Sequence, residues 1–104
     1  MSSLIVTPPK TSGETKQILF DFLSQLRVGE TISSASAVCT TWSGTDLSPG
    51  SVVSGLPSVS GSQVWVRVTG GVNGNVYMIT VTANTSLSNH PVIQTYLAVV
   101  NTPL

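Results

Sequence analysis

The chain has 104 residues, a length that allows one domain, and its four Lys and Arg residues balance its four Asp and Glu residues. Charged residues make up only 8% of the sequence, so the polar surface must come mainly from its 16 Ser and 13 Thr residues. Four scattered cations cannot neutralise a row of phosphates, and no apolar stretch approaches the roughly 18 to 20 residues that cross a bilayer. Nucleic-acid binding and a membrane-spanning helix are therefore excluded.

The first segment, residues 1–14, is predicted to be an extended arm outside the core. A Thr-Pro-Pro sequence removes two backbone donors and favours an extended chain. The arm also contains three consecutive apolar residues that are candidates for contacting a partner: Leu4, Ile5 and Val6. We expect the arm to be flexible or docked on a partner, and residues 15–104 to form the folded domain. The start lacks the features of a secretory signal, so the chain is expected to stay where it is made.

Weaker patterns follow in the first half of the domain. Residues 16–22 are predicted to form a strand with Ile18 and Phe20 inward, followed by one helical turn that ends before Gly29. Residues 31–41 form a further predicted strand, although its many small side chains leave the inward face ambiguous. Residues 43–62 are rich in Ser, Gly and Pro and are predicted to be loop, with one short strand around residues 52–56.

The second half alternates more clearly. Gln63–Thr69 places three valines on one face, and residues 76–84 and 92–100 continue with the same period of two. Between the first two of these strands lies a turn cluster that contains Asn-Gly, which favours the positive φ angles of a tight reversal. The turn residues are Gly70, Gly71, Asn73 and Gly74. The pattern predicts a hairpin there and three consecutive antiparallel strands.

Six or seven short strands in one small domain predict an all-β fold, an immunoglobulin-like antiparallel β-sandwich. The single cysteine, Cys39, cannot form an internal disulfide, and we interpret it as a small buried apolar residue. Tyr77 opens its strand, and its ring is expected to pack inward with the hydroxyl bonded to nearby backbone, as a structural corner.

Residues for catalysis are scarce. The candidates for acid–base work are one histidine and four carboxylates: His90, Glu14, Asp21, Glu30 and Asp46. His90 precedes a proline in a turn cluster, so we interpret it as a solvated loop residue. No nucleophile, phosphate-binding, zinc or calcium motif is present, so we predict no enzyme activity, cofactor or metal site. Asn84-Thr85-Ser86 matches a glycosylation sequence, which is common by chance in a chain rich in Ser and Thr.

Two tryptophans are candidates for partner contacts. If the valines of residues 63–69 face the core, Trp65 and Arg67 share the outer face, where an indole beside a guanidinium can anchor a partner. Trp65 could instead cover its own sheet, and Trp42 could be either a surface residue or the buried tryptophan of a sandwich.

The predicted sheet edges have few protecting residues. Free monomers usually guard their edges with Lys, inward charges or Pro, and a neutral surface also lacks the repulsion that keeps domains apart. We therefore expect other copies of the chain or other proteins to cover the edges, and the N-terminal arm could add as a strand to a neighbour.

Several sequence blocks resemble one family of small virion proteins from tailed bacteriophages, the phage fibre-tail adaptor proteins. They are Phe20-Asp21-Phe22 with Leu26, Val28-Gly29-Glu30-Thr31-Ile32-Ser33-Ser34, the stretch from Val64 to Gly71, the stretch from Gly74 to Val81, and Asn84-Thr85-Ser86. The resemblance covers residues 16 to about 100. Phe22 and Leu26 stand where the family usually has a tryptophan, and the loop at residues 43–62 looks longer than usual.

The resemblance implies a non-enzymatic structural subunit of the virion tail, made in the bacterial host cytoplasm and present in several copies around the tail axis. Its partners would be other copies of itself and other virion proteins, namely the tail or its adaptor ring and the fibres or spikes, with no membrane or nucleic acid. One alternative is a capsid decoration or cement protein on the same sandwich. Another is a carbohydrate-binding module that uses Trp65, Trp42 or Tyr96.

Overall fold

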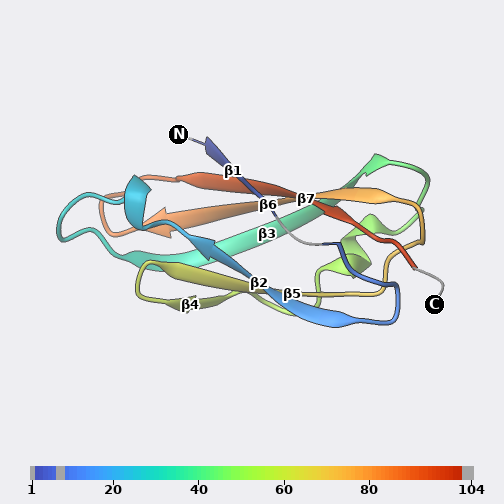
Figure 1. Cartoon of the computed structure of the whole chain (residues 1–104). Coiled ribbons are helices and arrows are strands. Elements are labelled where there is room, and N and C mark those ends of the chain that lie inside the picture. The colour runs from blue at the N-terminus through green and yellow to red at the C-terminus, as the bar shows by residue number, and fades with distance from the viewer. Residues whose placement is uncertain (1, 7–8, 102–104) are drawn as a thin grey trace.

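The computed structural model describes residues 2–6, as backbone, and residues 9–101. Seven strands form two layers (Figure 1), which confirms the predicted all-β sandwich. The strands are β1 (Ser2–Val6), β2 (Thr15–Asp21), β3 (Ile32–Ser43), β4 (Ser58–Ser60), β5 (Gln63–Thr69), β6 (Val76–Thr85) and β7 (Val92–Ala98). Two short 3-10 helices, η1 (Leu23–Gln25) and η2 (Pro49–Val52), lie in the connections, and η1 occupies the predicted helical turn.

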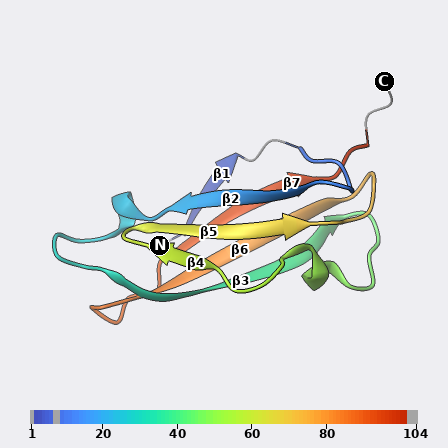
Figure 2. The same cartoon turned by 90° about the horizontal axis from the view of Figure 1, so that it is seen from below.

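One sheet has four strands in the order β1-β7-β6-β3, and the other has three in the order β2-β5-β4 (Figures 1 and 2). Taken in chain order, strands β2 to β7 divide between the sheets as strands B to G of an immunoglobulin domain do, B-E-D against G-F-C. Strand β1 instead pairs in parallel with β7. The sheet edges are β1 and β3 in one layer and β2 and β4 in the other.

The core forms where the alternating strands of the two sheets face each other. The three valines of β5 are fully buried, and the tyrosine, isoleucine and valine of β6 lie opposite them in the core. Ile18 and Phe20 of β2 are buried, as predicted. The ambiguous strand β3 turns Cys39 inward, together with the half-buried Ala35 and Ala37. Strand β3 borders the short strand β4 and η2.

The predicted hairpin between residues 63–69 and 76–84 is wrong. Strand β5 pairs with β2 and β4, and β6 pairs with β3 and β7, so residues 70–75 cross from one sheet to the other. Each strand buries one complete face, and these two faces are opposed in the core rather than side by side. The glycine-rich turn bends as expected, but it connects two layers. The antiparallel pairing of β6 with β7 agrees with the prediction.

The short strand predicted around residues 52–56 is also misplaced. Residues up to Val52 belong to η2, which has a proline in its first positions, and Val53 makes only an isolated bridge to Val68. Gly55 has a φ of 76°, which interrupts an extended chain. The strand follows at Ser58–Ser60 and pairs with β5.

The N-terminal segment is extended, but residues 2–6 lie on the edge of their own domain, paired with β7. The predicted arm also contacts the domain at Lys10. The backbone of Lys10 bonds to Ala98 and Val100, and its buried ammonium donates to the carbonyls of Thr11 and Gly70, each at 2.6 Å. Desolvation by this burial lowers the pKa of Lys10. The side chains of Leu4, Ile5 and Val6 lie outside the described part of the structure.

Candidate interaction surfaces

The outer face of the four-stranded sheet presents no charged side chain on its three described strands. We call this surface the uncharged face. Its residues are Ser34, Ser36, Val38, Thr40 and Trp42 on β3, Val76, Met78, Thr80 and Thr82 on β6, and Val92, Gln94, Tyr96 and Ala98 on β7. The largest exposed side chain here is Trp42, which is 60% exposed. Its ring lies 5.0 Å from that of Tyr96, tilted by 57°, and so reaches across β6.

The outer face of the three-stranded sheet is different. Trp65 and Arg67 share it, as the alternation of β5 predicts, and Arg67 is exposed. The half-buried Trp65 lies between Leu19 of β2 and Ser58 of β4. Its ring therefore covers part of its own sheet and also borders a shallow groove. That groove, of about 290 Å³, is lined by Gln17, Ser54, Gly55, Leu56, Ser58, Trp65 and Arg67.

At one end of the sandwich the carboxylate of Glu30 joins two loops. Glu30 is buried, and one of its oxygens accepts the backbone N–H of Arg27 at 2.9 Å. The other oxygen accepts the hydroxyl of Thr85 and the side-chain amide of Asn89. These bonds, from Thr85 first, then from the Arg27 backbone and Asn89, lower the pKa of Glu30. The residue holds the turn before β3 against the turn after β6, and we call this arrangement the Glu30 clamp.

The neighbouring Asn-Thr-Ser sequence belongs to the same end. The Asn84 amide donates to Ser34 Oγ at 2.9 Å, and the backbones of Ser86 and Thr31 are bonded through an N–H and a carbonyl. Asn84 Oδ1 lies 2.8 Å from Nδ1 of the exposed His90. All three residues of the sequence therefore connect strands and turns.

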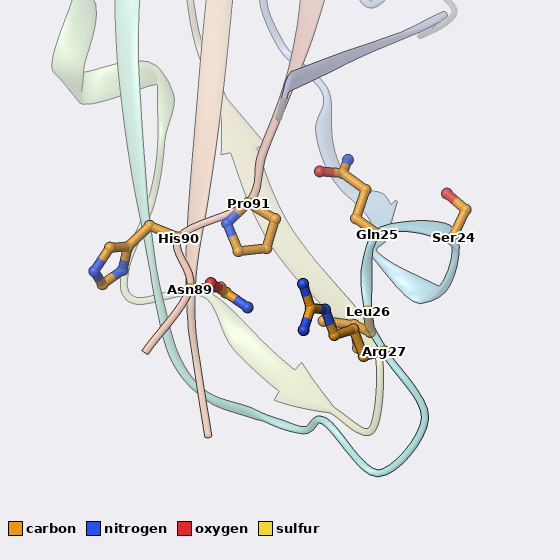
Figure 3. Close-up of a pocket in the computed structure, with 7 residues that line it drawn as sticks. All are labelled: Ser24, Gln25, Leu26, Arg27, Asn89, His90 and Pro91. Carbon is orange, nitrogen blue, oxygen red and sulfur yellow. The ribbon is translucent and has the colours of Figure 1, made fainter. Parts of the chain in front are cut away.

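A groove of about 390 Å³ lies beside this clamp (Figure 3). The guanidinium of Arg27 points towards Asn89 and Pro91, whereas the His90 ring is turned away from it. The His90 ring is hydrogen-bonded to the side-chain amide of Asn84 rather than to a carboxylate.

At the opposite end, Tyr77 plays the corresponding role. Its ring is fully buried, and its hydroxyl accepts the Val72 N–H at 2.8 Å and donates to Asp46 Oδ2 at 2.7 Å. Asp46 also accepts the N–H of Ser48. The pKa of Asp46 is lowered, by the Ser48 bond first and then by Tyr77, and burial raises the pKa of Tyr77. We call this arrangement the Tyr77 corner.

The glycine turn fits closely around this corner. Gly70, Gly71 and Gly74 all have positive φ values, and a Cβ on Gly71 would lie 2.8 Å from Val99 Cγ2. The Asn73 side chain accepts the backbone N–H of Asn101 at 2.8 Å. Of the turn residues predicted from the sequence, Gly71 packs against the Tyr77 ring and Asn73 ties the turn to Asn101.

Reactive groups are not assembled in the described residues. Burial raises the pKa of the Cys39 thiol to about 11, so it is protonated at neutral pH. Within residues 2–6 and 9–101, no three acidic, His or Cys side chains are placed to bind a metal ion. No helix in the same ranges is long and apolar enough to cross a membrane.

Sequence reasoning missed three polar residues that organise the loops, namely Lys10, Glu30 and Asp46. From the sequence, Lys10 is one of four scattered cations, Glu30 and Asp46 are possible proton carriers, and Glu30 also lies in one of the blocks that carry the family resemblance. The available signal was their scarcity: with eight charged residues in the chain, each one near a glycine-rich turn is a candidate for bonding to backbone.

Comparison with curated proteins gives no match, and comparison with solved structures gives none either. A family model described as podophage GP4 fiber-tail adaptor protein gp77 matches residues 10–92, from the buried Lys10 through both ends of the sandwich to the start of β7. Since this match covers most of the chain, the protein belongs to the podophage fibre-tail adaptor family.

Proposed function

We propose that this protein is a non-enzymatic adaptor, arranged in several copies around the tail axis, that joins the tail or its adaptor ring to fibres or spikes. The family supports a role as a tail adaptor in the virion. The observation that carries the finer proposal is the uncharged face, with Trp42 exposed on it. A bulky aromatic residue on a surface without charge is suited to being covered by a protein partner.

An adaptor must contact two different neighbours, and the two outer faces offer different chemistry. The uncharged face can pack against an apolar or hydroxyl-rich surface. The opposite face presents Arg67 beside Trp65, which fits a partner with acceptors or a carboxylate. We infer that one face contacts the tail side and the other the fibre side.

The N-terminal arm is the third contact in this proposal. Residues 2–6 add to β7 at the edge of the sheet, and the backbone of Lys10 bonds to Ala98 and Val100. A terminal strand held by one neighbour can exchange that pairing for an equivalent edge on another protein. We propose that the arm docks in this way in the assembled tail, by exchange of the strand at residues 2–6.

Cryo-electron microscopy of the intact particle tests the proposal. We expect density for this chain in a ring at the tail, between the tail tube or adaptor ring and the fibres. Density on the head would instead establish a decoration protein. A glycan array that gives specific binding lost in Trp65→Ala would favour the carbohydrate-binding alternative.

A variant test separates the two faces. Trp42→Ala should reduce incorporation into particles while the purified domain stays folded. Val28→Ala, at a fully exposed position in the turn before β3 and outside both outer faces, serves as the control and should leave incorporation unchanged. Normal incorporation of Trp42→Ala would contradict a partner contact on the uncharged face.

A further inference from the structure

Strand β3 is the longest strand of the molecule and lies at an edge of the four-stranded sheet. It spans Ile32–Ser43, and within the described residues it pairs with β6 alone. Alternate backbone N–H and C=O groups along its other side therefore point away from the sheet. Figure 2 shows β3 along the border of the molecule, next to the short strand β4 of the other layer.

The middle of this edge has no residue or bulge of the kind that usually blocks pairing, and its neighbours on the inner side are η2 and β4. The register with β6 shifts between Ile32 and Ser34 and again between Thr41 and Ser43, but it is unbroken from Ser34 to Thr41. That stretch contains no charged residue and no Pro. Edge strands of monomers generally carry at least one such residue, or a central bulge, because unpaired backbone groups attract another strand.

We propose that the β3 edge pairs with the β3 edge of a second copy of this chain, antiparallel and around a two-fold axis at Val38. In this register Val38 faces Val38 of the second copy, and Ser36 faces Thr40. Opposite residues then lie on the same face of the sheet, as antiparallel pairing requires. The two four-stranded sheets join into one sheet of eight strands, and the uncharged faces of the two copies become continuous.

A second copy fits this edge because pairing would bring no like-charged side chains of the two copies together. The charges nearest to β3 in the sequence are Glu30 and Asp46, and each accepts hydrogen bonds within its own domain. The chain has no formal net charge, so long-range repulsion does not oppose the approach. Val38, which is 58% exposed in the isolated chain, becomes covered by its equivalent.

The contact is small, so it should be weak in solution. Strand pairing alone buries less area than a standard interface of about 1,600 Å², which suggests a dissociation constant of micromolar order or weaker. Copies held next to each other in a particle are at a high effective concentration, and there the same contact would be occupied. The inference thus deepens the proposed function by naming a surface through which neighbouring copies around the tail would join in pairs.

Sedimentation of the purified chain over a concentration series tests the pairing. We expect a monomer–dimer equilibrium for the wild type, and about a tenfold or greater rise in the dissociation constant for Val38→Lys, because like charges then face each other. Val38→Glu should behave in the same way. A mixture of the two charged variants should form a dimer again, which general unfolding cannot imitate.

Val28→Lys is the matched control, because it adds the same charge at a fully exposed valine in the turn before β3, outside the edge. It should dimerise like the wild type. Backbone amide exchange should slow along residues 34–41 as the wild-type concentration rises. A wild type that remains monomeric near 1 mM, or a Val38→Lys protein that dimerises as well as the wild type, overturns the proposal. Because all of this is measured on the purified chain, its failure would leave the location at the tail to be decided separately by microscopy.

Discussion

The two ends of the sandwich fasten their loops with a single carboxylate each, but they do so by different means. In the Glu30 clamp three donors bond directly to the carboxylate oxygens. In the Tyr77 corner the carboxylate of Asp46 acts through a buried phenol, and the phenol also bonds to the backbone of Val72. The Glu30 clamp therefore depends on charge and hydrogen bonding, whereas the Tyr77 corner depends mainly on the packing of the buried ring.

Both arrangements nevertheless hold long turns with very few charged residues. In the hydrogen bonds that hold these turns, neither carboxylate is paired with a Lys or Arg side chain. Each accepts hydrogen bonds from uncharged donors instead. Such donors are abundant in a sequence rich in Ser, Thr and Asn. Hydrogen bonds to a charged group are stronger than neutral ones, so a few of them can hold long turns.

The largest effect is expected from Gly71→Ala, which breaks the shape-dependent end. The added Cβ would lie 2.8 Å from Val99 and 3.3 Å from the Tyr77 ring, at a φ of 94°. Left-handed strain and overpacking together should lower the melting temperature by about 15 °C or more. Thermal unfolding followed by circular dichroism measures this.

Gly70→Ala is the control for that variant. Gly70 also has a positive φ, 63°, but no heavy atom lies within 4 Å of its Cβ position. Only the backbone strain remains, so its melting temperature should fall by roughly a third as much. Equal losses for the two variants would show that close packing around Tyr77 does not matter.

Glu30→Gln should lower the melting temperature at neutral pH by about 10 °C, because an amide replaces one acceptor oxygen with a donor that faces other donors. The pKa of Glu30 is lowered in the folded state, so its contribution is present above its ordinary value of 4.5 and is lost as pH falls through the folded pKa. Melting curves of the wild type and the variant should therefore converge at acid pH.

Asp46→Asn provides the comparison at the other end. It should weaken the dependence of the melting temperature on acid pH less than Glu30→Gln does, because the Val72–Tyr77 hydrogen bond remains when the charge of Asp46 is removed. A greater flattening by Asp46→Asn would reverse the distinction between the two ends.

Tyr77→Phe is expected to lower the melting temperature by about 5 °C. The ring still fills the core, but the Val72 N–H and the Asp46 carboxylate each lose a partner. The effect should fall below that of Gly71→Ala because the packing is kept. A crystal structure or amide exchange should show the change confined to residues 45–48 and 70–75.

Sequence reasoning was most successful where alternation has one solution. The strands at β5, β6 and β7 bury one face each, so their inward residues followed directly from the period of two. The prediction was wrong where it concerned which strand pairs with which. The turn after β5 is rich in glycine whether it reverses within a sheet or crosses to the other sheet, so the hairpin could not be separated from the crossover by local sequence.

The candidate site was predicted less well for a similar reason. Trp65 and Arg67 could be placed on one face from their spacing in β5. The Glu30 clamp joins residues more than 50 positions apart, and no local pattern links them. Glu30 and Thr85 each appeared in the blocks that resemble the adaptor family, but their contact became visible only when β3 and β6 were paired.

The smallest effect is expected from His90→Ala, which probes the border of the Glu30 clamp. His90 is exposed, and its ring bonds to Asn84, whose amide is separately held by Ser34. Removing the ring should therefore change the melting temperature by less than about 2 °C, as surface substitutions usually do. Thr85→Val, which removes a donor from Glu30 itself, should cost several times more although it keeps the size of the side chain. If His90→Ala and Thr85→Val lower the melting temperature equally, the clamp is held by the turn after β6 as a whole rather than by the hydrogen bonds to Glu30.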